Sequence, residues 1–179
     1  MNLKLPRFYQ LALALAAVIG PFFWLVFTPD GQRRSDLFLL YLLGRPSFDL
    51  AYERLTDAVT EAMLRAQFPK VQFQCQTAPT NGLRLCAAPI AAFNGLPARA
   101  ARLYFAGEHL RMLQLDYRPR YRAVLERSLR AGLGAPREET TAAEPVLVWQ
   151  RPGGQILLPA VATANERDAA LIWLAGNAE

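Results

Sequence analysis

A long uncharged run near the N-terminus constrains this chain more than any other feature. Residues 8–29 contain no charged side chain, and in an α-helix these 22 residues would extend roughly 33 Å, enough to cross the hydrocarbon core of a bilayer. Aromatic side chains, which are typical of membrane–water interfaces, stand at both ends of the run. They are Phe8, Tyr9, Phe22, Phe23, Trp24 and Phe27. The run predicts a transmembrane helix, with residues 1–29 forming a short cytoplasmic tip and the span.

A cleaved signal peptide is the alternative interpretation of the same run. Lys4 and Arg7 form a short basic flank, and small residues recur in LALALAAVIG. Against this interpretation, the run is long for the apolar part of a signal peptide, and bulky aromatics stand where a small-residue cleavage site would lie. We therefore expect a retained anchor. Lysine and arginine are nearly balanced on the two flanks, so charge alone does not fix its orientation.

The two cysteines, Cys75 and Cys86, fall on a predicted β-hairpin. Apolar residues alternate with glutamines over residues 71–76, which is the period of a strand with one apolar face. Residues 83–90 provide a returning strand after an Asn81-Gly82 turn. Placing Cys75 opposite Cys86 puts the neighbouring apolar residues of both strands on one face, at a separation that a disulfide accepts.

Other roles for the cysteines fit the sequence less well. The chain has one histidine, His109, so a metal site would lack a recognisable ligand set. Ten residues separate the cysteines, whereas a thioredoxin-like redox pair is separated by two. We expect a structural disulfide, with two reduced core cysteines as the alternative. A disulfide implies an oxidising compartment, which places residues 47–179 in the periplasm and the anchor in a bacterial inner membrane, N-terminus inside.

Between anchor and domain, residues 30–46 form an apolar juxtamembrane segment. At its centre, residues 37–43 are apolar on every side and too few to span a membrane. They are Leu37, Phe38, Leu39, Leu40, Tyr41, Leu42 and Leu43. One interpretation is an extension of the membrane helix, or packing under the domain; the other is a contact surface for lipid or another membrane protein.

The periplasmic part shows two helices at similar places in two halves. The first is expected from an N-cap at Ser47, with a core-facing stripe from Tyr52 to Ala66. The second starts near Pro119 and ends at the glycine–proline sequence GLGAP, residues 132–136. Residues 137–143 are expected to be a polar loop.

An internal repeat with an offset of 69 positions connects these halves. In each half a helix is followed by a hairpin pattern and a third strand, and Phe105 corresponds to Leu174 at that offset. Residues 48–117 and 118–176 are the predicted units, and residues 110–117 add one strand to the first. The prediction is an α+β domain of about seven strands and two helices, with an antiparallel sheet.

The second unit carries a resemblance. A helix with a GAP stop, a VLVW…GG…ILL hairpin and a last strand LIWL resemble the α+β repeat units of beta-lactamase-inhibitor-protein-like and outer-membrane-assembly-lipoprotein folds. The resemblance covers residues 118–175 best and residues 48–117 less well. It implies a binding or assembly module without catalysis. This chain differs in having a membrane helix in place of a lipid anchor.

Residues for catalysis are scarce, and we predict no catalytic residue, cofactor or metal. The three serines lack a nucleophile-elbow setting, and no glycine-rich phosphate loop is present. Glu108 and His109 are adjacent at a predicted turn, which is typical of a solvated tip. An envelope hydrolase would require a carboxylate cluster around Glu108, Asp116 or Glu144.

One basic cluster is a possible anion contact. Arg118, Arg120 and Arg122 lie in YRPRYR, where guanidinium groups and tyrosines could hold phosphates. In the alternative interpretation they are the exposed side of a strand-to-helix junction, with Glu126 paired to Arg122 and Arg130 at helical spacing.

The expected function is a membrane-anchored periplasmic interaction or assembly subunit of an inner-membrane or envelope complex, without catalytic activity. Its expected partners are membrane lipid and another membrane or periplasmic protein, and not nucleic acid. The alternative is a periplasmic sensing domain for lipid headgroups or an envelope polyanion.

Overall fold

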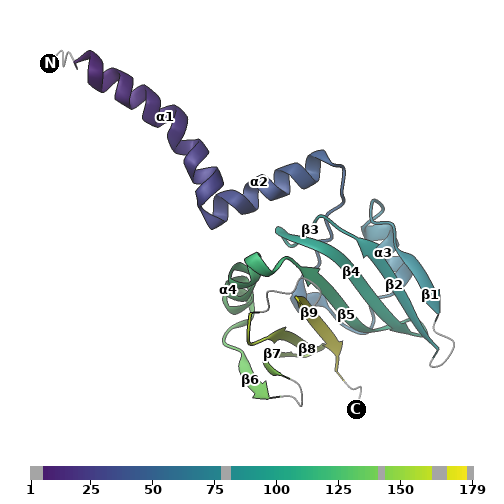
Figure 1. Cartoon of the computed structure of the whole chain (residues 1–179). Coiled ribbons are helices and arrows are strands. Elements are labelled where there is room, and N and C mark those ends of the chain that lie inside the picture. The colour runs from purple at the N-terminus through teal and green to yellow at the C-terminus, as the bar shows by residue number, and fades with distance from the viewer. Residues whose placement is uncertain (1–5, 78–81, 141–143, 163–168, 177–179) are drawn as a thin grey trace.

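Two helices precede the domain. The computed structural model describes residues 6–77, 82–140, 144–162 and 169–176. An extended Thr28 separates α1 (Arg7–Phe27) from α2 (Pro29–Leu42). α1 is long and apolar enough to cross a membrane, and none of its residues is buried. In Figure 1 it projects away from the domain, whereas α2 turns sharply and lies along the domain. The predicted helix is therefore present and is compatible with a single-pass membrane anchor.

Within the described residues, the domain is built on one antiparallel sheet of nine strands in the order β1-β2-β4-β5-β9-β8-β7-β6, with β3 paired to β4. The strands are β1 (Gln74–Thr77), β2 (Leu83–Pro89), β3 (Ala92–Phe93), β4 (Leu96–Ala106), β5 (His109–Tyr117), β6 (Arg137–Thr140), β7 (Pro145–Arg151), β8 (Gly154–Pro159) and β9 (Ala170–Ala175). Every strand pair is antiparallel. The predicted α+β class is confirmed.

Helices cover one face of this sheet. They are α3 (Glu61–Gln67), α4 (Arg122–Leu133) and the short 3-10 helices η1 (Tyr52–Arg54) and η2 (Pro119–Tyr121). Leu64 of α3 and Leu125 and Leu129 of α4 are buried in one core with Leu103 and Leu113 of the central strands. In Figure 1, α3 lies behind β2 and β4. The main core therefore lies between this sheet face and the helices.

The first predicted helix is mostly wrong. Ser47 is not an N-cap but forms a β-bridge with Ala92, and the backbone around it is extended. Phe48 is fully buried, with its ring 4.7 Å from that of Phe68 and 5.8 Å from that of Phe73. An extended path lets this segment cross the core, and only η1 and the short α3 are helical. The spacing in the sequence matched a helix, but tertiary packing decides the backbone here.

Two strands were not expected. β3 is a two-residue strand, and β6 occupies part of the predicted polar loop. β6 pairs with β7 through registers such as Glu138 with Leu147, and all four of its side chains are exposed. A polar edge strand carries no apolar alternation, which is why the sequence pattern resembled a loop. Residues 141–143 of that predicted loop and the Asn81 position of the predicted turn lie outside the described residues.

The two halves share an order of elements in the sheet. β1 and β2 form a hairpin whose second strand pairs with β4, and β7 and β8 form a hairpin whose second strand pairs with β9. Within the strands the offset differs from the predicted one. Phe105 is buried, and Trp173, 68 positions later, is buried too, whereas Leu174 is partly exposed. The boundaries of the two repeat units stay a prediction.

Candidate interaction surface

Thr28 forms the elbow between α1 and α2. Its hydroxyl donates to the Trp24 carbonyl at 2.7 Å and accepts the Gly31 amide at 3.0 Å. Gln32 Nε2 donates to the Val26 carbonyl at 2.7 Å. One side chain thus satisfies the end of one helix and the start of the next. These bonds fix the direction in which the chain leaves α1.

Gly31 packs the first turn of α2 directly on α1. A Cβ atom there would lie 2.2 Å from the Trp24 carbonyl oxygen and 2.6 Å from the Leu25 Cα atom, so only glycine fits. The Arg34 guanidinium lies 5.6 Å from the centre of the Trp24 ring, within cation–π distance. Asp30 binds Arg33 at 2.7 Å and Arg34 at 3.1 Å, and these contacts hold the pKa of Asp30 below its ordinary value. The elbow is therefore a close-packed joint.

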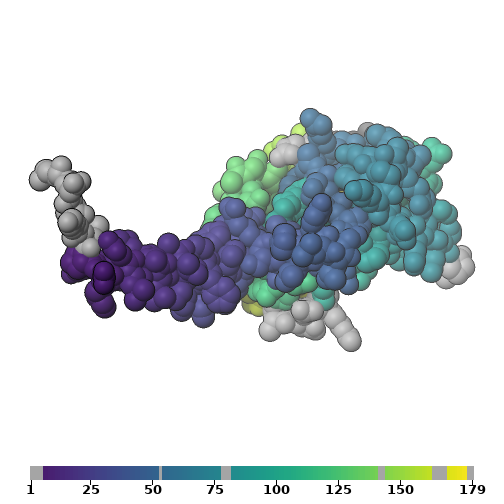
Figure 2. All heavy atoms as spheres, turned by 90° about the horizontal axis from the view of Figure 1, so that it is seen from above, coloured from purple at the N-terminus to yellow at the C-terminus, as the bar shows by residue number. Residues whose placement is uncertain are grey.

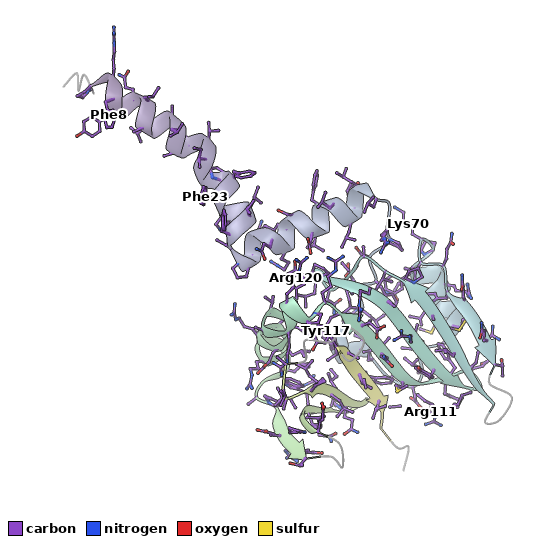
Figure 3. The ribbon with its side chains drawn as sticks, in the orientation of Figure 1. Phe8, Phe23, Lys70, Arg111, Tyr117 and Arg120 are labelled. Carbon is purple, nitrogen blue, oxygen red and sulfur yellow. A yellow bond between two sulfur atoms is a disulfide. The ribbon has the colours of Figure 1, made fainter. Side chains whose placement is uncertain are left out.

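Asp36 joins α2 to the domain. Its Oδ2 atom accepts from Arg118 Nη1 at 3.1 Å, from Tyr121 OH at 2.8 Å and from Arg120. The Arg120 guanidinium also lies 5.0 Å from the centre of the Tyr121 ring. Figure 3 places Arg120 between α2 and the domain. Burial, followed by the hydrogen bond to Asp36, raises the pKa of Tyr121 to about 12. We call Asp36, Arg118, Arg120 and Tyr121 the Asp36 clamp.

Apolar and backbone contacts support this clamp. Leu40 is 6% exposed and packs with Ala91 and Ala92, with Leu37 partly buried beside them. Arg33 Nη1 donates to the Gly95 carbonyl at 3.3 Å. α2 is therefore part of the domain's packing and not a free linker.

The structure divides the predicted contact residues 37–43 into two sets. Leu37 and Leu40 face the domain. The others are exposed in this structure: Phe38, Leu39, Tyr41, Leu42 and Leu43. The interpretation as packing under the domain holds for the first set, and the contact surface stays a prediction for the second.

The predicted anion contact is not one open site. Arg118 and Arg120 bind Asp36. The Arg122 side chain is 12% exposed and donates to Glu126 at 2.6 Å and to the carbonyls of Pro159 and Ala160. Glu126 also binds Arg130 at 2.8 Å, and together these contacts lower the pKa of Glu126. The alternative, helical pairing of Glu126 with Arg122 and Arg130, is confirmed.

Cys75 and Cys86 form the predicted disulfide, with Cα atoms 4.0 Å apart as direct partners of β1 and β2. Phe73 and Ala88 are buried on the same side, as the hairpin register predicts. Glu61 lies near enough to complete a three-ligand group with the two sulfurs. Because both sulfurs are bonded to each other, this group has no free thiolate to offer a metal.

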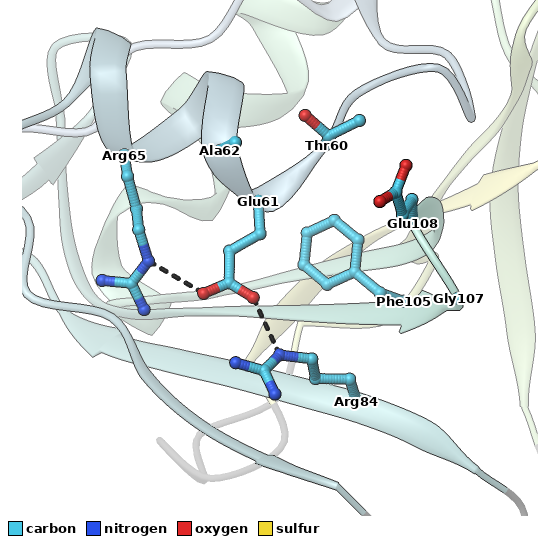
Figure 4. A pocket seen from close by; sticks show the side chains of 8 residues that line it. All are labelled: Thr60, Glu61, Ala62, Arg65, Arg84, Phe105, Gly107 and Glu108. Atoms are coloured by element: carbon cyan, nitrogen blue, oxygen red, sulfur yellow. Dashed lines mark hydrogen bonds and ion pairs between the residues drawn. The ribbon is translucent and has the colours of Figure 1, made fainter.

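A groove of about 450 Å³ runs beside α3, lined by Thr60, Glu61, Ala62, Arg65, Arg84, Phe105, Gly107 and Glu108. Figure 4 shows Glu61 between Arg65 and Arg84, each 2.8 Å from one of its carboxylate oxygens. The hydrogen bond from Arg84, with that from Arg65, holds the pKa of Glu61 below its ordinary value. Glu61 is thus suited to an ion-pair role and poorly suited to donating a proton.

Glu108 and Asp116, two of the carboxylates that a hydrolase would require, are not brought together. Glu108 precedes β5 and Asp116 lies near its other end, which at about 3.3 Å per residue separates them by roughly 26 Å. Asp116 is buried and bound by Arg102 at 2.5 Å and by Gln114 at 3.0 Å.

The second face of the sheet carries an apolar row that sequence reasoning missed. Leu85, Tyr104, Met112 and Leu174 are successive Cα partners across β2, β4, β5 and β9. All four are partly exposed, whereas Leu113 and Trp173, which adjoin Met112 and Leu174 in their strands, are buried in the core. No helix among the described residues packs on this face, which Figure 1 presents to the viewer. We call these four residues the open-face row.

Some functional residues could have been found from sequence and others could not. The open-face row follows from the period-two pattern once the strand order is known, but the sequence does not give that order. Asp36 lies between Ser35 and the apolar run, and no neighbouring residue indicates the partners of its carboxylate. Its partners lie 82 to 85 positions away, which no local pattern signals.

Comparisons with known proteins add little. No protein-family model and no curated protein matches the chain. Among solved structures, a DUF4309 family protein (YjgB) from Bacillus subtilis matches with a TM-score of 0.36 and 11% sequence identity. The match covers 79% of this chain and 95% of that one. Likeness at this level transfers neither a fold nor a function.

Proposed function

We propose that this protein is a non-catalytic interaction or assembly subunit, anchored in a bacterial inner membrane by α1, with its α+β domain in the periplasm. The observation that carries the proposal is the open-face row, an apolar stripe on a sheet face that no described helix covers. Partly exposed apolar side chains in a continuous row are typical of protein contact sites.

The joint between anchor and domain supports the same function. The elbow at Thr28 and the Asp36 clamp connect α1 to the sheet through directed contacts. A subunit held in this way presents the open-face row in one orientation to partners in the same membrane. Glu61, which lines the groove beside α3, is engaged by Arg65 and Arg84, which favours a binding role over catalysis for this carboxylate.

The alternative, a sensing domain for lipid headgroups or a polyanion, has less support. Arg118, Arg120 and Arg122 would have to release Asp36 and Glu126 before they could bind such a ligand.

A photo-crosslinking experiment tests the proposal. The photoreactive amino acid p-benzoylphenylalanine would replace Tyr104 or Met112 in the full-length protein within intact cells. Arg127, which is exposed on α4, is the matched control position. We expect an adduct with one membrane or periplasmic protein from the two open-face positions and none from position 127. The absence of an adduct, together with a lone monomer after purification in mild detergent, would reject the proposal.

A further inference from the structure

α2 has two faces with different neighbours. Arg33, Asp36, Leu37 and Leu40 recur at spacings of three and four and contact the domain. The opposite face has Arg34, Phe38 and Leu42 at spacings of four, with Tyr41 beside them. Phe38 is 61% exposed, Leu42 63% and Tyr41 79%. We call this second set, Arg34, Phe38, Tyr41 and Leu42, the outer face of α2.

The elbow places the outer face of α2 on the same side as the last turns of α1. Arg34 begins this face and lies over Trp24, in the last turns of α1. Gly31 is in contact with the same end of α1. If α1 spans the bilayer, its last turns lie at the membrane–water interface, as the aromatic residues there indicate. The outer face of α2 therefore begins at the level of the lipid headgroups.

The overall arrangement keeps the outer face on the membrane side. In Figure 2, seen from above, α2 lies over the domain and α1 extends beyond it. The domain occupies the opposite side of α2, through the Asp36 clamp and Leu40. α2 thus separates the domain from the region into which α1 projects, and neither neighbour covers the outer face.

The chemistry of the outer face fits a membrane surface. Aromatic and aliphatic side chains lie beside Arg34, and exposed Arg45 follows at the end of the helix. The two acids of α2, Asp30 and Asp36, are both engaged by arginines, Asp30 by Arg34 of the outer face itself, so neither acid adds an uncompensated negative charge at this surface. Basic, aromatic and aliphatic residues on one face are the composition of helices that lie in the plane of a membrane interface and favour anionic lipids.

We propose, resting on the membrane anchor of the proposed function, that the outer face of α2 lies in the headgroup region of the bilayer that α1 crosses, in contact with anionic lipid. The sheet then stands away from the membrane. β4 starts beside α2, and its 11 residues at about 3.3 Å each place the β4–β5 turn roughly 36 Å further out. Contact between the outer face of α2 and the headgroups would hold the sheet, and with it the open-face row, in a fixed orientation relative to the membrane.

Spin labels in the full-length protein test this proposal. Single variants Phe38→Cys and Leu42→Cys place a nitroxide on the outer face, Glu108→Cys places one at the distant turn, and Leu15→Cys places one within α1. The native cysteines are joined to each other and do not compete for the label. Each variant is reconstituted in phosphatidylcholine vesicles with or without phosphatidylglycerol, and the collision rates of the nitroxide with oxygen and with a water-soluble nickel complex are compared.

We expect oxygen to dominate at positions 15, 38 and 42 and nickel to dominate at position 108. We also expect phosphatidylglycerol to increase the ratio of oxygen to nickel collisions at position 38. Arg45→Gln should reduce that increase. Nickel access at position 38 equal to that at position 108, with position 15 still buried in lipid, would overturn this proposal and leave the anchor intact. Nickel access at position 15 would reject the anchor itself. Dipolar broadening at position 38, with both reagents excluded, would assign the outer face to a second copy and overturn the lipid contact.

Discussion

Arg118 Nη1 lies 3.1 Å from Asp36 Oδ2, and this ion pair joins residues 82 positions apart in the sequence. It connects the helix that follows the anchor to the junction between β5 and α4. The domain is consequently held to the anchor by side-chain contacts as well as by the chain itself.

Replacing the clamp carboxylate should release α2 from the domain. Asp36→Asn removes the charge that Arg118, Arg120 and Tyr121 share, and we expect a loss of about 1–2 kcal/mol in the free energy of unfolding. Backbone amides of α2 should exchange hydrogen faster while those of β4 and β5 keep their protection. Asp30→Asn is the control, because Asp30 pairs with Arg33 and Arg34 of α2 itself. Equal exchange in both variants would contradict the clamp.

Adding one methyl group at the elbow should change its angle. Gly31→Ala would place Cβ 2.2 Å from the Trp24 carbonyl oxygen, so α2 must move away from α1. Pulsed electron spin resonance between labels on the two helices should report a longer or broader distance distribution. Gly20→Ala serves as the control, since its added Cβ would meet no side chain or other segment within 4 Å beyond its neighbours in the helix. An unchanged distribution in Gly31→Ala would show that the joint is looser than these contacts indicate.

Alkaline pH should weaken the domain through Tyr121. Its pKa is raised from 10 to about 12 in the folded protein, so the folded state favours the neutral phenol. The resulting stabilisation is complete below pH 10 and is lost as the pH rises through about 12. Tyr121→Phe should flatten this loss in urea unfolding experiments. It should not abolish it, because burial also raises the pKa of Tyr117. If Tyr121→Phe lost unfolding free energy with rising pH as steeply as the parent protein, Tyr121 would not be the cause of the alkaline destabilisation.

The disulfide should contribute measurably to stability. It closes a loop between residues 11 positions apart, for which about 3 kcal/mol is expected from the restricted unfolded chain. Reduction of the parent protein and the double variant Cys75→Ala, Cys86→Ala should lower the free energy of unfolding by similar amounts. If reduction of the Cys75–Cys86 bond leaves the free energy of unfolding of the parent protein unchanged, the bond has no such role.

The sequence allowed those parts of the fold to be predicted that depend on local patterns. The uncharged run gives α1, and the alternation around Cys75 and Cys86 gives their hairpin pairing, because both are periodic over neighbouring residues. The apolar residues 37–43 could not be divided in advance. Every one of them is apolar, and only the position of Ala91 and Ala92 makes Leu40 the buried one.

Long-range packing explains the remaining differences. Phe48 is drawn into a cluster of phenylalanines, which prevents the predicted helix from starting at Ser47. The arginines near residue 120 looked like a ligand site, because Asp36, the acid that engages two of them, lies far away in sequence. The resemblance to inhibitor-protein and lipoprotein folds stays a prediction.

The proposed function requires that the domain lies outside the cytoplasm, on the far side of the membrane that α1 crosses. The most direct test labels Arg111→Cys, an exposed position on β5, with a membrane-impermeant maleimide in intact spheroplasts. We expect one label per chain before lysis, and two further thiols only after denaturation and reduction. No labelling before lysis, with Cys75 and Cys86 free in the unreduced protein, would place the domain in the cytoplasm and reject the proposed topology.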